Sequence, residues 1–335
     1  MMAPDLSFAG RRVLVTGAGG FIGSHVVERL AQQGTKVTAL LRYTSRSQLG
    51  GLASLPSELL AKIELVRGDV RDLDVVRDLV AQADVVFHLA ALIGIPYSYA
   101  RPQEVIDTNI IGTANVLLAA RDGDTVRRVV LTSTSEVYGS ARYVPIDEEH
   151  PLQAQSPYAA TKIAADALGI SFHRSFGLPV TIVRPFNAYG PRQSARAVIP
   201  TIVSQAVSGL PLRLGSLDTT RDFTYVADTA QGFLDIASSD ACLGEVVNLG
   251  TGREVTIREV VRIAGEIAGR ELEVQVDEQR LRPQASEVTR LLADASKAQR
   301  LAGWTAQVPI EEGLRLTFDW VRKHIDLFRP EDYAV

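Results

Sequence analysis

The stretch VLVTGAGGFIGSHVVERL, which begins at Val13, constrains the fold more than any other part of the chain. An apolar run leads directly into a glycine-rich turn, and a helical pattern follows it. Gly17 allows the tight turn, Gly20 lets a pyrophosphate approach the backbone, and Gly23 allows the helix to lie close to the strand. The N-terminus of that helix faces the negative charge. The stretch therefore predicts a dinucleotide-binding unit.

Short apolar runs alternate with helical patterns along the chain. The runs are RRVLVTG, KVTALL, IELVRG, DVVFHLA, VRRVVLTS, LPVTIVRP and GEVVNLG. Apolar residues at helical spacing lie between most of them, as over residues 104–121 and 157–175. Because strands alternate with helices, we predict an α/β fold of the Rossmann type, a doubly wound parallel sheet with helices on both faces.

The alternation loosens beyond about residue 186, where irregular stretches such as NAYGPRQSARAVIP separate the elements. We interpret this part as a smaller C-terminal α/β lobe that binds the substrate. The dinucleotide-binding domain is predicted to span residues 1–185 and to be rejoined by about 220–250, and the substrate lobe to span mainly 186–335, interleaved with it. Ligands of such sheets bind beyond the carboxyl ends of the strands.

Composition and charge argue against several classes of partner. The net charge is −4 with acids and bases interspersed, so no nucleic-acid partner is expected. Cys242 is the only cysteine, which excludes an intramolecular disulfide and fits a reducing compartment. The first residues lack the apolar core of a signal peptide, and no window approaches the roughly 18 apolar residues of a membrane span. We therefore expect a soluble, cytoplasmic protein with no membrane partner.

The histidines do not suggest a metal site. The five histidines are scattered, and no Cys/His cluster accompanies them, so no metal is predicted. His88 falls within an expected strand and His173 within an expected helix, and we interpret both as structural.

The end of the second expected strand bears on the choice of dinucleotide. An acid there would hold the ribose 2′-hydroxyl of NAD, but the chain has Leu41. Arg42, Ser45 and Arg46 follow and could hold a 2′-phosphate. NADP is therefore favoured over NAD. The alternative is that these arginines are solvated surface groups.

Tyr158 and Lys162 in SPYAATKIAADAL lie four residues apart and therefore on one face of a helix. A tyrosine with a pKa near 10 is a poor base at neutral pH. A lysine ammonium about 4 Å away, at an effective dielectric constant near 20, is worth roughly 4 kcal/mol, or about three pK units. After a glycine fingerprint and a hydroxyl-rich strand end, the pair predicts a catalytic tyrosine and lysine.

The motifs TGAGGFIG, HLAA, DTNIIGT, TSTSEVYG, YAATK and RPFNAYGP together resemble the extended short-chain dehydrogenase/reductase family that acts on nucleotide sugars. The resemblance runs to about residue 325. It implies that Tyr158 takes a proton from a sugar hydroxyl, that Lys162 lowers the Tyr158 pKa and holds the nicotinamide ribose, and that Thr134 hydrogen-bonds the reacting oxygen. The implied cofactor-binding residues are Gly17, Gly20, Phe21, Ile22, Gly23, Arg42, Asp69, Val70, Leu89, Ala90, Ala91, Asn109, Tyr158, Lys162 and Pro185.

Thr134, Ser135 and Glu136 distinguish members of this family. Epimerases carry small neutral residues there, whereas the 4,6-dehydratases carry Thr–Asp–Glu or Thr–Ser–Glu. In a dehydratase, oxidation at carbon 4 makes the carbon 5 proton acidic, and a carboxylate removes it as water leaves carbon 6. Glu136 fits that base. The alternative is an acid that caps a loop or pairs with Arg142.

Ser135 departs from the aspartate that many dehydratases carry. Either Glu136 both removes the carbon 5 proton and delivers it to the leaving oxygen, or Ser135 relays the proton through water. The triplet resembles that of the GDP-mannose dehydratases. The loop AALIGIPYSYARP is more similar to the legionaminic-acid type, and it places Leu92, Ile93 and Gly94 where an apolar wall could accept an N-acetyl group. UDP- or GDP-N-acetylglucosamine is therefore the leading substrate.

The resemblance also places nucleotide-binding residues in the second lobe. Asn187 could bind a phosphate or the sugar, and Arg221 and Arg282 are forked donors suited to phosphate or ribose. Val198, Ile199 and Pro200 would line the nucleobase. The full set of expected substrate-binding residues is Ser98, Thr134, Glu136, Asn187, Val198, Arg221 and Arg282.

Other functions stay open from the sequence. A nucleotide-sugar 4-epimerase or decarboxylase shares the cofactor motifs, and a 5,6-dehydratase needs the same base. A non-catalytic dinucleotide-sensing protein is a remote alternative. In the family the helices equivalent to 104–121 and 157–175 pair between subunits, so a homodimer is expected through Val116, Leu117, Ala164 and Leu168; these residues could instead pack on the sheet.

Overall fold

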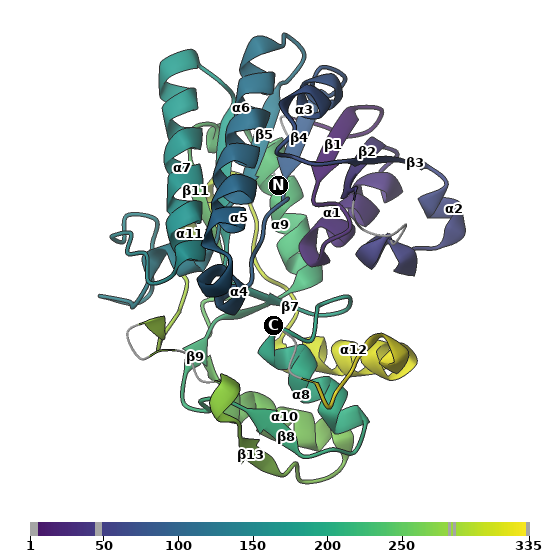
Figure 1. Ribbon diagram of the computed structural model, residues 1–335, viewed down its shortest axis with the longest axis vertical. Coiled ribbons are helices and arrows are strands. Elements are labelled where there is room, and N and C mark those ends of the chain that lie inside the picture. Colours follow the sequence, from purple (N-terminus) through teal and green to yellow (C-terminus); the bar gives the residue numbers. More distant parts are fainter. Residues whose placement is uncertain (1–5, 44–48, 281–282, 284–285, 333–335) are drawn as a thin grey trace.

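The computed structural model describes residues 6–43, 49–280, 283 and 286–332 (Figure 1). Its largest element is a seven-stranded sheet in the order β3-β2-β1-β4-β5-β6-β11, with every neighbouring pair parallel. The strands are β1 (Arg12–Thr16), β2 (Lys36–Arg42), β3 (Ile63–Gly68), β4 (Val85–His88), β5 (Arg128–Thr132), β6 (Val180–Pro185) and β11 (Val246–Leu249). Each of the seven apolar runs forms one of these strands.

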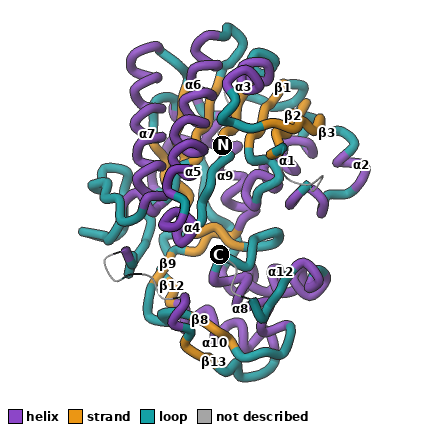
Figure 2. Tube along the Cα trace, in the orientation of Figure 1, coloured by secondary structure: helices purple, strands orange, loops and turns teal. Residues whose placement is uncertain are grey.

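Helices cover both faces of this sheet (Figures 1 and 2). Along β1, Val15 packs with α1 and α9 on one face, whereas Leu14 packs with α3 and α6 on the other. This alternation follows from the two-residue period of a strand. The helices are α1 (Phe21–Gln32), α3 (Leu73–Val80), α6 (Gly112–Asp122), α7 (Pro157–Phe176) and α9 (Val226–Ser238). The predicted Rossmann-type α/β fold is confirmed.

The strand order reverses between β1 and β4, and this point marks where a ligand binds in such sheets. Thr16 pairs in register with His88, and His88 with Leu131, so the carboxyl ends of β1, β4 and β5 meet at one edge. The expected dinucleotide turn follows β1, and Thr134 to Glu136 follow β5. The fold therefore brings these two motifs to the same edge.

The helical segment predicted over residues 104–121 is interrupted. Helix α5 (Pro102–Ile106) continues through a π-helical turn, Asp107–Ile111, into α6. Such turns often occur at functional sites. The segment predicted over 157–175 is the single helix α7. The Ser156 side chain caps its N-terminus by accepting from the Ala159 N–H at 3.1 Å, and Gly177 caps its C-terminus.

The second lobe lies beyond the carboxyl ends of the strands, in the lower part of Figures 1 and 2. Its apolar core joins residues of α8, α10 and α12, among them Ile202, Ile263 and Phe318. The helices are α8 (Val198–Val207), α10 (Ile257–Ala268) and α12 (Ile310–Lys323). The strands pair as β7 (Asn187–Tyr189) with β10 (Phe223–Tyr225), β8 (Leu212–Leu214) with β13 (Val274–Val276), and β9 (Thr220–Arg221) with β12 (Val255–Thr256). The domain limits drawn from the sequence stay a prediction.

Shorter helices complete the described part: α2 (Ser57–Leu60), α4 (Ile95–Ala100) and α11 (Ser296–Ala302). Within residues 6–43, 49–280, 283 and 286–332, no helix has the length and apolar character needed to cross a membrane.

Candidate active site

A cavity of about 1000 Å³ opens where the carboxyl ends of the strands face the second lobe. Both expected functional motifs of the sheet edge contribute to it, together with β6, β7, α7, α8 and β9. The predicted site residues that line it are Gly17, Gly20, Phe21, Ile22, Gly23, Arg42, Asp69, Val70, Leu89, Ala90, Ala91, Thr134, Ser135, Glu136, Tyr158, Lys162, Pro185, Asn187, Val198 and Arg221.

The glycine turn fits a pyrophosphate. Gly17 has φ +68°, and a Cβ there would lie 2.6 Å from the Ala90 nitrogen; a Cβ at Gly23 would lie 2.3 Å from the Gly17 oxygen. Helix α1 begins after Gly20 with no side-chain cap and no acid in its first turn. Since Phe21, Ile22 and Gly23 line the cavity, the positive end of the helix dipole faces it. These residues can hold the diphosphate of a nicotinamide dinucleotide.

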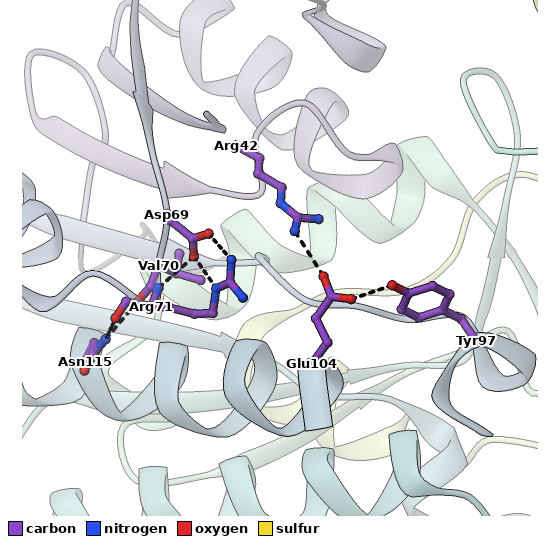
Figure 3. A network of polar contacts seen from close by, with 7 residues as sticks. All are labelled: Arg42, Asp69, Val70, Arg71, Tyr97, Glu104 and Asn115. Carbon is purple, nitrogen blue, oxygen red and sulfur yellow. Dashed lines mark hydrogen bonds and ion pairs between the residues drawn. The ribbon is translucent and has the colours of Figure 1, made fainter. Parts of the chain in front are cut away.

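Polar contacts hold the loop after β3, at the adenosine end of the expected cofactor site (Figure 3). Asp69 accepts from the Arg71 guanidinium at 2.6 and 3.0 Å, which lowers the Asp69 pKa. The Asn115 amide on α6 donates to the Val70 and Arg71 carbonyls, both at 3.0 Å. Neither Arg71 nor Asn115 was anticipated; Arg71 is only two residues from Asp69, whereas only the fold brings Asn115 of α6 beside the loop after β3.

Arg42 lines the cavity at the end of β2, but its guanidinium has a protein partner. Its Nη2 donates to Glu104 Oε1 at 3.1 Å, and the Tyr97 hydroxyl donates to Glu104 Oε2 at 2.5 Å (Figure 3). Glu104 therefore competes for the cation that favoured NADP. Ser45 and Arg46, the other residues invoked for a 2′-phosphate, lie outside the described residues.

Tyr158 and Lys162 are buried on the face of α7 that turns toward the cavity. Lys162 Nζ donates to the Thr132 carbonyl at 2.8 Å, and burial lowers the Lys162 pKa to about 8, although Asp166 opposes this shift. Burial also raises the Tyr158 pKa, which the Thr134 hydrogen bond lowers and Glu136 and Asp166 raise. Lys162, which was expected to lower the Tyr158 pKa, is not among the groups that shift it, and burial of the hydroxyl raises the pKa instead.

The residues after β5 form a short turn that carries the expected triplet. Thr134 caps the 3₁₀ helix η3 (Ser135–Tyr138) by accepting from the Glu136 N–H at 3.2 Å, and it also hydrogen-bonds Tyr158. Ser135 is buried, whereas Glu136 is half-buried, and both line the cavity. A hydroxyl, a carboxylate and a phenol therefore line one wall of the cavity, where such groups can act as general acids and bases.

The second lobe supplies the opposite wall. The Arg221 side chain is only 8% exposed. It donates to the Thr220 carbonyl at 2.9 Å, and its Nη2 lies 3.4 Å from Glu287 Oε1. Asn187 Oδ1 is buried without a partner among the described residues. Val198 begins α8 at this wall, next to the cavity-lining Ile199, whereas Pro200 does not line the cavity. Arg282 lies outside the described residues.

Two further predicted residues do not line the cavity. Asn109, in the π-helical turn, accepts from the Leu92 N–H at 2.8 Å and donates to the Leu92 carbonyl and Thr161, both at 3.0 Å. Ser98 is fully buried, and its hydroxyl donates to the Ile95 carbonyl at 2.7 Å within α4. Asn109 therefore supports the loop that carries Leu92, and Ser98 holds its own helix.

The sequence reasoning also missed two arginines of the cavity. Arg196 follows β7 and is exposed, and Arg280 pairs with Asp277 at 3.1 Å. The paired arginines of RQSAR and QRLR were the only signal available, and a surface position explains such a signal equally well.

The histidines expected to be structural have structural partners. His88 lies between the hydroxyls of Thr16 at 2.8 Å and Thr113 at 3.1 Å, and His173 Nδ1 lies 2.8 Å from the Leu178 carbonyl. Burial, reinforced by Lys162, lowers the His88 pKa to about 3. In the part of the chain that the structure describes, no group of three or more His, Cys, Asp or Glu side chains could hold a metal ion.

Comparison with known proteins gives consistent matches over nearly the whole chain. The family model for GDP-mannose 4,6-dehydratase matches residues 14–317. The dTDP-glucose 4,6-dehydratase of Streptomyces antibioticus is 33% identical over 95% of this chain and 94% of its own. The UDP-N-acetyl-alpha-D-glucosaminuronate decarboxylase of Bacillus cytotoxicus is also 33% identical, over 93% and 98%. The UDP-glucuronic acid 4-epimerase of Bacillus cereus, solved with UDP-glucuronic acid and NAD, matches at 28% identity and a TM-score of 0.84 over 93% and 99%.

Proposed function

The chain belongs to the nucleotide-sugar-modifying group of the extended short-chain dehydrogenase/reductase family, and on that premise we propose that it is an NDP-sugar 4,6-dehydratase. The observation that carries the proposal is Glu136, a carboxylate on the cavity wall that also holds Thr134 and Tyr158. Dehydration needs a base at carbon 5 in addition to the base at the carbon 4 hydroxyl. Glu136 and Tyr158 supply two separate proton acceptors.

Tyr158 removes the proton from the carbon 4 hydroxyl. The Thr134 hydrogen bond stabilises the resulting phenolate. The Lys162 side chain, when protonated, provides a positive charge on the same helix face. A bound nicotinamide dinucleotide would supply the hydride acceptor and donor. The glycine turn would hold its diphosphate, and the cavity wall from Asp69 to Val70 its adenosine.

Glu136 then takes the carbon 5 proton of the 4-keto sugar. Hydroxide leaves carbon 6 with a proton and departs as water, which creates the carbon 5–carbon 6 double bond. Glu136 can deliver the proton itself, or buried Ser135 can relay it through water. With the hydride that a bound dinucleotide would return to carbon 6 and a proton at carbon 5, the product would be a 4-keto-6-deoxy sugar and the cofactor would end unchanged. These steps make the enzyme a hydro-lyase.

The proposed substrate is a nucleotide hexose, with UDP- or GDP-N-acetylglucosamine as the leading candidate. Leu92, Ile93 and Gly94 line the cavity and offer an apolar wall for an N-acetyl group. On the opposite side, Asn187 and Arg221 offer an acceptor and a forked cation for the nucleotide diphosphate or ribose.

NADP is the proposed form of the cofactor, tightly bound and recycled, with NAD as the alternative. Two features of the strand end support NADP: Leu41 replaces the acid that would hold a ribose 2′-hydroxyl, and Arg42 can hold a 2′-phosphate. The Glu104 carboxylate supports NAD, because a 2′-phosphate would have to compete with it for Arg42. NAD is the dinucleotide in the solved epimerase from Bacillus cereus.

A 4-epimerase or decarboxylase is the second candidate, because relatives of similar identity carry those names. Either reaction would use Tyr158 and Lys162 in the same way, but neither needs an acid at position 136. A 5,6-dehydratase uses Glu136 in the same way and differs only in whether hydride returns to carbon 6. A non-catalytic dinucleotide-sensing role remains the remote alternative, and the presence of both Tyr158 and Lys162 argues against it.

We also propose a homodimer, through different residues from those first expected. Val116 and Leu117 are fully buried against the sheet, so they are not available to a partner, and Leu168 is partly buried in the same core. The exposed apolar residues of the α5–α6 segment and α7 are Ile106, Ile111 and Phe176, at 37%, 46% and 54% exposure.

The proposed reaction is tested by incubating the protein with UDP- and GDP-linked glucose, mannose and N-acetylglucosamine. A 4,6-dehydratase gives a product lighter by one water, with a ketone at carbon 4 and a methyl group at carbon 6 by NMR. An epimerase gives an isomer of unchanged mass. Loss of water without a methyl group would identify a 5,6-dehydratase instead.

A further inference from the structure

A buried polar network fastens both ends of the turn that carries Thr134, Ser135 and Glu136. At the N-terminal end, the Ser133 hydroxyl donates to Asp166 Oδ2 at 2.9 Å. At the C-terminal end, the Tyr138 hydroxyl donates to Asn248 Oδ1 at 2.7 Å. All four of these residues are at least 97% buried.

Arg184, at the end of β6, joins the two ends of the turn. Its Nε and Nη2 donate to Asp166 Oδ2 at 3.0 and 2.9 Å, and its Nη1 donates to the Tyr138 hydroxyl at 2.9 Å. The guanidinium also lies 5.0 Å from the centre of the Tyr138 ring. One cation therefore connects the residue before Thr134 with the residue two positions after Glu136.

The same network fixes the turn relative to the tyrosine and lysine. Asp166 lies one helical turn beyond Lys162 on α7, and Lys162 Nζ donates to the Thr132 carbonyl at 2.8 Å. Helix α7 thus bonds to Thr132 and Ser133 in succession. These contacts hold the helix that carries Tyr158 beside the turn that carries Glu136.

We propose that Arg184 and Asp166 are positioning residues that hold Glu136 in reach of the sugar while Tyr158 stays in place. This inference rests on the proposed function for the identity of the step, and on the geometry alone for the existence of the clamp. A displacement of about 1 Å can cost on the order of 10²-fold in rate. A carboxylate on a short turn therefore needs support from its neighbours.

Arg128 offers a matched control at the opposite end of the neighbouring strand β5. It is also buried, pairs with Asp240 and donates to the Ala237 carbonyl at 2.9 Å, but its contacts do not involve the turn. Arg184→Met and Arg128→Met each remove a buried cation from its carboxylate. Only Arg184→Met should loosen the turn.

Tyr138→Phe is the milder variant, should Arg184→Met fail to fold. It removes one hydroxyl, so that Arg184 Nη1 and Asn248 Oδ1 each lose a partner. Its control is Tyr143→Phe, which removes a hydroxyl that donates to Asp147 at 2.8 Å on the surface. Arg184→Lys keeps a cation beside Asp166 and should restore part of the lost activity.

The experiment measures kcat and KM per folded protein, the accumulation of reduced cofactor, and amide deuterium exchange over residues 133–138. In Arg184→Met and Tyr138→Phe we expect kcat for water loss to fall at least about tenfold, with KM within about threefold and reduced cofactor accumulating. Exchange in the turn should be faster in these two variants and unchanged in Arg128→Met and Tyr143→Phe.

The outcomes separate this inference from the proposed function. If the wild-type protein releases no water from any nucleotide sugar, the proposed function is wrong, and the exchange data still decide whether the clamp exists. If Arg184→Met and Tyr138→Phe match their controls in both kcat and turn exchange, the network is only structural support and the inference is overturned.

Discussion

Glu136 and Tyr158 line the same cavity, where burial raises the pKa of the Tyr158 hydroxyl and the Glu136 carboxylate raises it further. The two groups reach this position from different elements, since Glu136 lies on the turn after β5 and Tyr158 on the first turn of α7. A single acid–base residue suffices for oxidation at carbon 4, whereas elimination needs a second.

Tyr158→Phe should abolish turnover and leave nucleotide-sugar affinity almost unchanged. The lost oxygen acts mainly in the transition state, so kcat should fall by about 10²–10⁴-fold. Steady-state kinetics and a direct binding measurement on the same preparation test this. A variant that kept more than about a tenth of the activity would show that Tyr158 is not the base.

Arg221→Met should weaken binding of the nucleotide sugar and leave kcat within about threefold. A hydrogen bond to a charged group is worth about 1.5–3 kcal/mol, so the Kd should rise by at least about tenfold. Arg290→Met is the control, because Arg290 lies beside the same strand but binds Glu254 at 2.7 and 2.8 Å outside the cavity. Equal affinities in the two variants would remove Arg221 from the nucleotide site.

His88 should make the fold less stable in acid. Its pKa is lowered from 6.5 to about 3, so the unfolded chain binds a proton between these values that the folded protein does not. The free energy of unfolding therefore falls as the pH drops through this window, by about 2 kcal/mol between pH 7 and pH 5.

Denaturant unfolding of the wild type and His88→Gln at the two pH values measures this contribution. The drop should be smaller in the variant by about that amount. His25, whose pKa is lowered to about 4, contributes in the same direction in both proteins and cancels from the comparison. An identical drop in both proteins would show that His88 is not responsible.

Light scattering at micromolar concentration should give twice the 36.3 kDa mass of the chain. Ile111→Asp should give the monomer mass, because a carboxylate at an apolar interface is costly to desolvate. Leu327→Asp, at an exposed position of the second lobe, should stay dimeric. A monomeric wild type would contradict the proposed homodimer.

Local patterns in the sequence predicted the sheet and the wall that holds Tyr158. The seven strands follow from apolar runs, and the glycine turn and the Tyr158–Lys162 pair depend on residues no more than six positions apart. Val116 was left open between a dimer contact and packing on the sheet, because periodicity does not say which face of a helix meets the core; Ser98 was expected from the family resemblance alone. Glu104 beside Arg42, and Arg184 beside Asp166 and Tyr138, join residues that only the fold brings together. No local pattern indicates such pairs.

The dehydratase assignment depends most directly on Glu136→Gln, assayed in deuterated water. Hydride removal from carbon 4 needs Tyr158 and Lys162 but not Glu136, so the variant should accumulate reduced cofactor with a bound 4-keto sugar. Because the amide cannot accept the carbon 5 proton, little deuterium should enter carbon 5 and little product lighter by one water should form. Release of water at close to the wild-type rate would contradict the account, and Glu136 would then be only a structural acid.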